Sequence, residues 1–240
     1  MKKKFVIGDI HGNYKGLLQC LQRSGFDYEN DELIALGDIC DGLTQTKECF
    51  DELLKIKHLI LIVGNHDYWF LEWASQEGHP GRIWTDQGGR NTQLSYGDSP
   101  LNVPESHIKL IEGSSFGMVD EETNSLFVHG GIDPNKPFEG QDSNILMWDR
   151  DLVRVARLKH NQKPDYKYGD YNEIFVGHTS TTYFAKTTEP KQFCNVWMLD
   201  TGGGWDGKLT IMNRETKEYW QSDLTPDLYP GVMPRYALIG

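Results

Sequence analysis

The amino-acid sequence predicts an α/β fold with parallel strands in its first half, and two observations support this prediction. Five short apolar runs, rich in Ile, Val and Leu, each end at a glycine or a polar cluster, which is typical of strands buried on both faces. Segments with helical spacing separate the first three runs, as in strand-helix-strand units. The five runs are residues 5–7, 33–36, 59–63, 126–128 and 174–176.

Four helical segments are expected. Asn13 is suited to cap the first helix, which carries leucines at helical spacing and has Gly25 just past its end. A second helix is expected to start at Thr44, and a third is expected to follow Asp67. A further helix is expected over residues 143–159.

The remaining segments have weaker patterns. Residues 78–104 are rich in Gly, Pro, Asn and Ser without a clear period, so we expect an inserted loop or cap there. Short β-type segments near the C-terminus predict a second, more antiparallel sheet, and the tail after Pro226 is expected to be extended. These segments are residues 197–199, 209–212 and 218–220. The 240 residues fit a single domain.

The composition favours a cytoplasmic protein without a membrane segment. Hydrophobic residues make up 38% of the chain, enough for a substantial core, yet no apolar run approaches the roughly 18 residues that span a bilayer. The basic start is similar to a secretory leader, but Asp9 and His11 end its apolar stretch too early. The four cysteines form no Cys-x-x-Cys pair, so we expect reduced thiols in a reducing compartment.

The net charge of −11 restricts the partners that the chain can bind. A diffuse negative field repels the phosphate backbone, which argues against general nucleic-acid binding. The same field would repel an anionic substrate unless bound divalent cations neutralised part of it locally.

Polar side chains that bind metals stand at the carboxyl end of each predicted strand, where open α/β sheets bind ligands. Any one of them alone is more simply explained as a turn residue or a core histidine, but five such clusters in series predict a metal site. Oxygen and imidazole ligands suit two divalent ions, with Mn²⁺ as first choice and Fe, Zn²⁺ or Mg²⁺ as alternatives, and the lack of cysteine ligands argues against structural zinc. The side chains are Asp9, His11, Asp38, Asn65, His66, His129 and His178.

Five motifs together resemble the phosphoprotein phosphatase type of calcineurin-like metallophosphoesterases, in particular the small bacterial and phage serine/threonine protein phosphatases. The similarity spans about residues 5–212, in the order and approximate spacing of the family. The motifs are Gly-Asp-Ile-His-Gly at 8–12, Gly-Asp-Ile-Cys-Asp at 37–41, Gly-Asn-His-Asp at 64–67, His-Gly-Gly at 129–131 and Gly-His-Thr at 177–179.

The resemblance implies a four-layered αββα sandwich of two mixed sheets with a dinuclear metal centre between them. A metal-bound hydroxide would then attack the phosphate ester, since coordination lowers the pKa of water to about 7. The implied ligands are Asp9, His11, His178 and the bridging Asp38 for one ion, and Asp38, Asn65 and His129 for the other.

The resemblance also implies a general acid. His66 would protonate the leaving oxygen, and Asp41 would orient its imidazole and favour its protonated form. Asn65 is expected to contact the substrate as well as a metal. The aromatic residues near these motifs, Trp84 among them, are expected to belong to the core and receive no role.

One position departs from the family. Gly42 stands where the family usually has a phosphate-binding arginine, so one phosphate contact is missing or supplied from elsewhere. Arg150 resembles the second phosphate-binding arginine of the family. Arg82 and Arg90 are candidates to replace the first, because a guanidinium binds phosphate through two parallel hydrogen bonds, although both could equally be surface charges.

The function expected from these features is hydrolysis of phosphoserine and phosphothreonine in proteins, with phosphotyrosine as a further substrate. The first alternative is a symmetrical dinucleoside polyphosphate hydrolase acting on diadenosine tetraphosphate, a branch that usually lacks an aspartate at the position of Asp41. A second alternative, motivated by Gly42, is a metal-binding regulatory module without catalysis. The expected partner is therefore a phosphoprotein or a small phosphorylated molecule.

Overall fold

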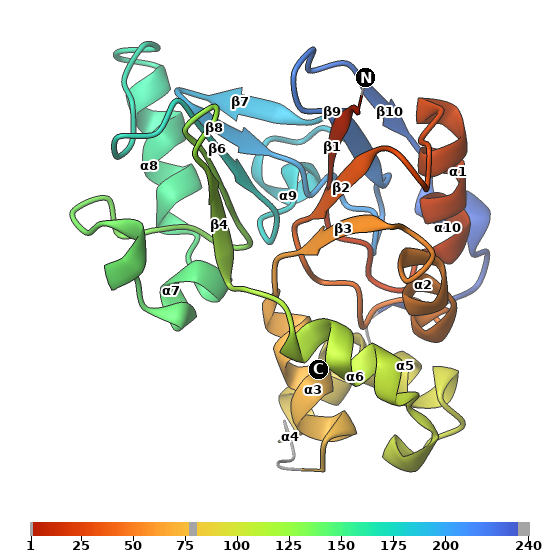
Figure 1. Cartoon of the computed structure of the whole chain (residues 1–240). Coiled ribbons are helices and arrows are strands. Elements are labelled where there is room, and N and C mark those ends of the chain that lie inside the picture. The colour runs from red at the N-terminus through yellow and green to blue at the C-terminus, as the bar shows by residue number, and fades with distance from the viewer. Residues whose placement is uncertain (1, 77–80, 235–240) are drawn as a thin grey trace.

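The structure, a computed structural model, describes residues 2–76 and 81–234 of the chain. These residues form two five-stranded sheets, and each sheet combines parallel and antiparallel pairs (Figure 1). The first sheet contains, in spatial order, β10 (Tyr219–Gln221), β9 (Thr210–Asn213), β1 (Lys4–Ile7), β2 (Glu32–Ala35) and β3 (His58–Leu61). The second contains β4 (Gly117–Asp120), β5 (Ser125–Val128), β6 (Glu173–Val176), β8 (Val196–Met198) and β7 (Lys191–Phe193).

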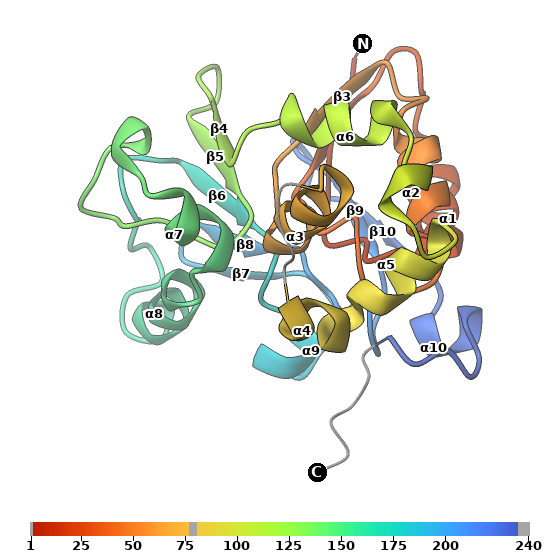
Figure 2. The same cartoon turned by 90° about the horizontal axis from the view of Figure 1, so that it is seen from below.

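Helices cover the outer face of each sheet and complete the predicted four-layered αββα sandwich (Figures 1 and 2). Helices α1 and α2 pack on the first sheet together with α3, while α7 and α8 pack on the second. The longer helices are α1 (Tyr14–Ser24), α2 (Thr46–Leu53), α3 (Asn65–Ala74), α6 (Glu105–Glu112) and α8 (Asp151–His160). Short helices are α4 (Gly81–Trp84), α5 (Arg90–Ser95), α7 (Ser143–Trp148), α9 (Thr181–Phe184) and α10 (Thr225–Leu228).

A separate apolar cluster joins the inner faces of the two sheets. Phe127 of β5 and Phe175 of β6 stack with their ring centroids 4.9 Å apart, facing apolar residues of β1 and β2. Burying this layer removes apolar surface from water, which holds the sheets at a fixed separation. The buried members are Val6, Ile34, Leu36, Ile62, Phe127, Phe175, Leu199 and Met212.

The strands and the first helix follow the sequence prediction closely. All five apolar runs contain strands, and β1, β2 and β3 are parallel as expected. Asn13 caps α1 by accepting a hydrogen bond from the Gly16 N–H, and Gly25 ends the helix in the left-handed conformation with φ of 64°. The second helix starts two residues later than expected, and the third starts at Asn65 instead of following Asp67.

Asn13 provides a stability prediction, because its side chain joins α1 to the C-terminal segment. Its amide donates to the Gly203 carbonyl at 2.7 Å while its oxygen caps the helix at 2.8 Å. We expect Asn13→Ala to lower the free energy of unfolding by about 2 kcal/mol in urea titrations. Asn161→Ala, at an exposed asparagine, is the control and should change it by less than about 0.5 kcal/mol. Equal losses in the two variants would contradict this role.

The helix expected over residues 143–159 is instead two helices. Asp149 has an extended backbone with ψ of 139°, and its carboxylate accepts from the Leu152 N–H at 2.9 Å, so it ends α7 and stabilises the start of α8. The apolar spacing continues across this break, which is why the sequence pattern did not reveal it. The break turns Arg150 toward the second sheet, where its Nη1 donates to the His178 carbonyl at 3.0 Å.

The segment expected to be a loop or cap is mostly helical in its described part, residues 81–104. It consists of α4, a π-helical turn at Thr85–Gly89, α5 and a 3₁₀ turn at Pro100–Asn102. Gly88, with φ of 105°, kinks this chain between α4 and α5. Helices of four to six residues contain too few turns to show a period, so the sequence pattern could not predict them. Residues 77–80 lie outside the described residues.

The C-terminal β-segments do not form the separate antiparallel sheet that was expected. β9 and β10 extend the first sheet, where β9 is antiparallel to β1, and β8 lies in the second sheet parallel to β6. Alternation predicts strands but does not determine their partners. The tail after Pro226 starts in α10 and is thus partly helical, and residues 235–240 lie outside the described part. No helix in the described part is long and apolar enough to cross a bilayer.

Candidate metal centre and active site

The predicted metal-binding side chains gather at one edge of the two sheets. β1 and β2 deliver Asp9, His11 and Asp38 to the same edge because they are parallel, and β5 and β6 deliver His129 and His178 from the second sheet. Asn65 begins α3 beside them, close enough for its Oδ1 to lie 3.1 Å from His129 Nε2. Each of these side chains belongs to a residue less than 10% exposed.

Backbone strain and close approaches mark the same loops. His11, Asp38 and His178 have φ of 49°, 50° and 61°, a left-handed conformation that costs non-glycine residues roughly 1–3 kcal/mol each. A Cβ at Gly64 would lie 2.2 Å from Asp38 Oδ1, and one at Gly177 would lie 2.2 Å from Asp9 Oδ1. Glycine is therefore required in these two motifs so that the backbone can pass the carboxylates.

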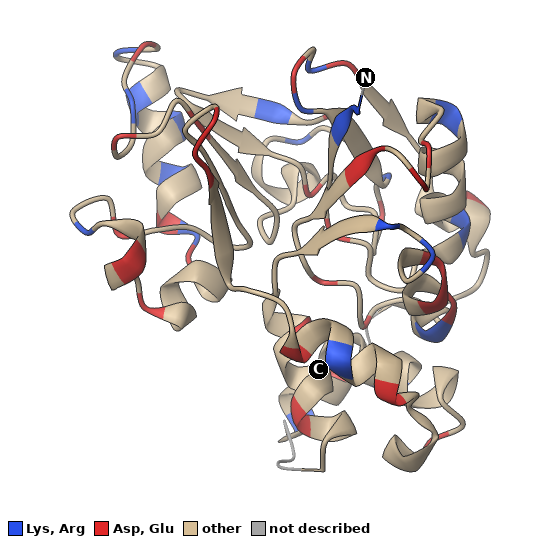
Figure 3. Cartoon of the chain, in the orientation of Figure 1, with Lys and Arg blue, Asp and Glu red and all other residues tan. Residues whose placement is uncertain are grey.

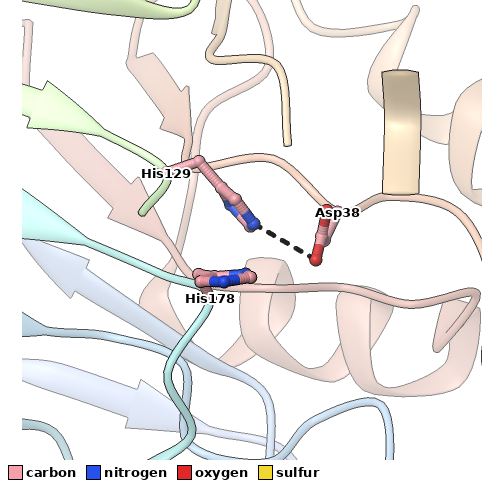
Figure 4. A group of neighbouring side chains, drawn as sticks. All are labelled: Asp38, His129 and His178. Carbon is pink, nitrogen blue, oxygen red and sulfur yellow. Dashed lines mark ion pairs between the residues drawn. The ribbon is translucent and has the colours of Figure 1, made fainter. Parts of the chain in front are cut away.

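Asp38 lies at the centre of the cluster. His129 Nε2 lies 3.2 Å from Asp38 Oδ2 (Figure 4). His11 Nε2 lies 3.6 Å from the same oxygen. The candidate ligand atoms form two groups within 4.8 Å, one with Asp9, His11 and Asp38 and the other with Asp38, His129 and His178. Asp38 belongs to both groups, as expected of a bridging ligand.

His178 is grouped differently from the expected ligand set. The structure places its ring with Asp38 and His129, whereas the resemblance implied that it shares an ion with Asp9 and His11. Its contact with Asp9 is made by the backbone, because the His178 N–H donates to the Asp9 carboxylate at 3.0 Å. The geometry therefore favours His178 as a ligand of the same ion as His129.

The tautomers of the histidines suit metal binding. His11 Nδ1 lies 2.9 Å from the Cys40 carbonyl and His129 Nδ1 lies 2.7 Å from the Leu36 carbonyl. A carbonyl only accepts, so Nδ1 donates in both rings and Nε2 is directed at Asp38. The buried Nε2 of His178 has no hydrogen-bond partner among the residues that the structure describes, and burial lowers the pKa of this ring to about 2. The ring is therefore neutral and suited to bind a metal without a competing proton.

The charges of the cluster also call for cations. Burial, followed by the nearby Asp200, raises the pKa of Asp9 well above its ordinary value. Burial lowers the pKa of His129, but the Asp38 and Asp9 carboxylates and the Leu36 carbonyl together outweigh it and raise the pKa to about 10. Such coupling shows how strongly the buried carboxylates favour a neighbouring positive charge. Oxygen and imidazole donors at this spacing fit a pair of divalent ions.

Two buried aspartates lie at the site although the sequence did not predict a role for them. Asp67 accepts from the Ile39 N–H at 2.8 Å and from the Gly64 N–H at 3.1 Å, so it ties the loop after β2 to the start of α3. Asp200, 2% exposed, follows β8, and burial raises its pKa to about 6. The signal that predicted the candidate ligands, a polar residue just after an apolar run, applies to Asp200 as well.

His66 and Asp41 form a buried pair beside the candidate ligands. Asp41 Oδ2 lies 2.6 Å from His66 Nδ1, and because an ionised carboxylate only accepts, Nδ1 donates. The His66 backbone N–H donates to Asp38 Oδ1 at 3.0 Å, which connects the pair to the centre of the cluster. Nε2 is the ring nitrogen through which His66 would exchange a proton with a bound substrate.

Of the three candidate arginines, only Arg150 is near the ligands. Arg150 lines an open cavity of about 630 Å³ together with His178, Asp200 and Trp205. Arg82, with 83% of its side chain exposed, pairs with Asp86, and Arg90 pairs with Asp98. Neither is among the described residues that line the cavity.

The structure explains why Gly42 is not an arginine. Its φ is 84°, and a Cβ there would lie 3.2 Å from the His11 Cβ and 3.3 Å from the Trp205 ring. Trp205 packs on the His11 ring, with centroids 4.6 Å apart. A side chain at position 42 would require a strained left-handed backbone and a small shift of this indole, which disfavours an arginine there.

The distribution of charged residues agrees with a site that depends on cations. Acidic residues occur on the outer helices and also in loops between the two sheets, while basic residues are scattered (Figure 3). The net charge of −11 would repel a phosphorylated substrate at a distance, so attraction has to be local.

Comparison with known proteins identifies relatives over most of the chain. A family model described as calcineurin-like phosphoesterase matches residues 3–205. The chain is 36% identical to serine/threonine-protein phosphatase 2 of Salmonella typhimurium, over 86% of this chain and 90% of that protein. It is 25% identical to a symmetrical bis(5'-nucleosyl)-tetraphosphatase of Proteus mirabilis, over 92% and 98% of the two chains.

Solved structures with low sequence identity share the fold. A putative diadenosine tetraphosphatase superposes with a TM-score of 0.65 at 16% identity, covering 92% of each chain. A serine/threonine phosphatase from Saccharomyces cerevisiae superposes with a TM-score of 0.60 at 15% identity, covering 98% of this chain and 83% of that one. Both confirm the two-sheet architecture.

Proposed function

Because the chain belongs to the calcineurin-like phosphoesterase family, and is thus a metal-dependent hydrolase of phosphoric esters, we propose that its substrates are phosphoserine and phosphothreonine proteins, with phosphotyrosine proteins as a further class. The observation that carries this proposal is the buried pair of His66 and Asp41 beside the candidate metal ligands. The 36% identity to a bacterial serine/threonine phosphatase over nearly the full length supports it.

The pair matters because the leaving groups differ in basicity. A serine or threonine ester releases an alkoxide, which is strongly basic and has to be protonated as the P–O bond breaks. His66 is placed to supply this proton through Nε2 because Asp41 accepts from Nδ1. A symmetrical dinucleoside polyphosphate releases a nucleoside diphosphate, which is a stable anion and gains less from a general acid.

The remaining side chains position the ester. Asp9, His11, Asp38, Asn65, His129 and His178 are the proposed ligands of the two ions, for which we favour Mn²⁺. When bound, the ions would activate a water and neutralise the phosphoryl oxygens. Arg150 faces the same cavity and is the proposed phosphate contact, and Asn65 would contact the phosphate beside it. Arg82 and Arg90 are not retained in this role because they pair with surface carboxylates.

A second candidate is the symmetrical hydrolysis of diadenosine tetraphosphate. The cavity beside the ligands is lined by Trp205 and Tyr183, whose rings could stack on an adenine base. Tetraphosphatases of several bacteria are also among the relatives. The alignment with one of them runs over 287 positions, more than the 240 residues of this chain, so that relative contains insertions that this chain lacks.

A comparison of kcat/KM for a phosphothreonine peptide and for diadenosine tetraphosphate distinguishes the two candidates. With Mn²⁺ present, we expect the peptide to be preferred by about tenfold or more, which is about 1.4 kcal/mol of transition-state stabilisation. A preference of the same size for the dinucleotide would reverse the assignment. Hydrolysis of neither substrate would instead favour the metal-binding module without catalysis.

A further inference from the structure

The carboxylate of Asp41 accepts hydrogen bonds from the inserted segment, residues 81–104. The indole Nε1–H of Trp84 donates to both of its oxygens, at 2.8 and 3.0 Å. The hydroxyl of Thr92 donates to Oδ1 at 2.8 Å. With His66 on Oδ2, three side chains therefore donate to this carboxylate.

The direction of each bond follows from the groups involved. Thr92 Oγ1 accepts from the Asp41 backbone N–H at 2.8 Å and donates its only hydrogen to the Asp41 carboxylate. Thr46, whose hydroxyl lies 3.1 Å from that of Thr92, must then be the donor to Thr92. The hydroxyl of Thr92 thus uses its one donor and both acceptors, and no rotamer change is available without breaking a bond in a buried site.

The inserted segment is packed closely enough to hold these groups in place. Trp84 is 2% exposed, and its ring lies 5.6 Å from that of Trp73 in α3. A Cβ at Gly89 would lie 2.4 Å from the Trp84 ring, so glycine lets the chain pass directly over the indole. The Asn91 amide donates to the Gly42 carbonyl, which joins the segment to the loop that carries Asp41.

We propose that Trp84 and Thr92 are positioning residues, which fix the Asp41 carboxylate so that His66 presents Nε2 to the leaving oxygen. This inference rests on the proposed function, in which His66 is the general acid. The inserted segment would then influence catalysis through Asp41, which orients the general acid His66, without contacting the substrate. A segment that served only as core would affect folding and every substrate alike.

Leaving-group dependence tests the positioning role. Phenyl phosphate releases phenolate, which is a poor leaving group. For Trp84→Phe we expect kcat on this ester to fall about tenfold, as for other residues that orient a catalytic side chain. With p-nitrophenyl phosphate, whose leaving group needs no proton, kcat should fall by less than about twofold. KM and the metal content of the protein should be unchanged.

Two matched variants separate positioning from packing. Trp73→Phe alters a buried tryptophan of the same aromatic cluster without removing a donor to Asp41, so the two substrates should respond equally. Thr92→Val removes the second donor with little change in volume and should reproduce the selective loss, whereas Thr92→Ser keeps the hydroxyl and should restore the wild-type ratio.

A double variant shows whether the effect passes through His66. In a His66→Asn background, Trp84→Phe should lower kcat by less than about twofold, because residues that act as one unit are not additive. An additional tenfold loss in that background, or an equal loss on both esters, would overturn the inference. If His66→Asn itself shows no leaving-group dependence, the general acid of the proposed function fails instead.

A measurement on the metal-free protein tests the contact without activity. The indole N–H resonance of Trp84, identified by its absence in Trp84→Phe, should shift in Asp41→Asn, while that of Trp73 should not. An unshifted Trp84 resonance would contradict the bond to the carboxylate.

Discussion

Asp38→Asn is expected to abolish metal binding and catalysis together. Asp38 Oδ2 is the atom toward which His129 Nε2 and His11 Nε2 converge, at 3.2 and 3.6 Å. Replacement by an isosteric amide removes the negative charge that both proposed ions share and presents an amide hydrogen or a weaker oxygen donor. Loss of residues that merely orient a ligand costs about 10–100-fold in metal affinity, so loss of a shared ligand should exceed about 100-fold.

The measurement combines elemental analysis with kcat/KM on p-nitrophenyl phosphate after passage through a metal-free column. Asp31→Asn is the matched control, because Asp31 is also a buried aspartate, accepting from two backbone N–H groups far from the ligands. It should retain its ions and its activity. An Asp38→Asn protein with the metal content of the wild type would show that Asp38 is not the shared ligand.

His66→Asn is expected to keep the ions and lose most of the rate on poor leaving groups. Asparagine can still donate to Asp41, which preserves the buried bond that His66 makes at 2.6 Å. It carries no titrating proton, so kcat on phenyl phosphate should fall by about 10²–10⁴-fold, the usual contribution of a general acid. The loss with p-nitrophenyl phosphate should be much smaller, since p-nitrophenolate leaves without protonation.

The same substitution at His58, a half-buried residue at the start of β3, provides the control and should leave both rates unchanged. Equal losses of His66→Asn on the two esters would remove it as the proton donor. A simultaneous loss of metal would instead assign it a role in holding Asn65, its neighbour in α3.

The candidate site was largely predictable because each candidate ligand lies within four residues of the end of a strand. Asp9, Asp38 and His129 come right after apolar runs, and the structure brings them to one edge through parallel pairing. Asp200 obeys the same rule after β8 but belonged to a segment expected in a different sheet. Local pattern identifies such residues, while the pairing of distant strands decides which of them meet.

What the sequence could not reveal depends on contacts between distant segments. The grouping of His178 with His129, the bond from Trp84 to Asp41 and the crowding of Gly42 by Trp205 all join residues that lie far apart in the chain. The break between α7 and α8 has a local cause instead, because Asp149 accepts from the N–H of Leu152 only three residues on, and the continuous apolar spacing concealed this cap. Arg82 and Arg90 were plausible by residue type alone, and the structure pairs each with a carboxylate nearby in the sequence.

A crystal structure of the protein grown with Mn²⁺, with an anomalous difference map, tests the central claim most directly. The account predicts two anomalous peaks on either side of Asp38, one also touching Asp9 and His11 and the other touching His129 and His178. Peaks away from Asp38, or no peak within coordination distance of its carboxylate, would contradict it.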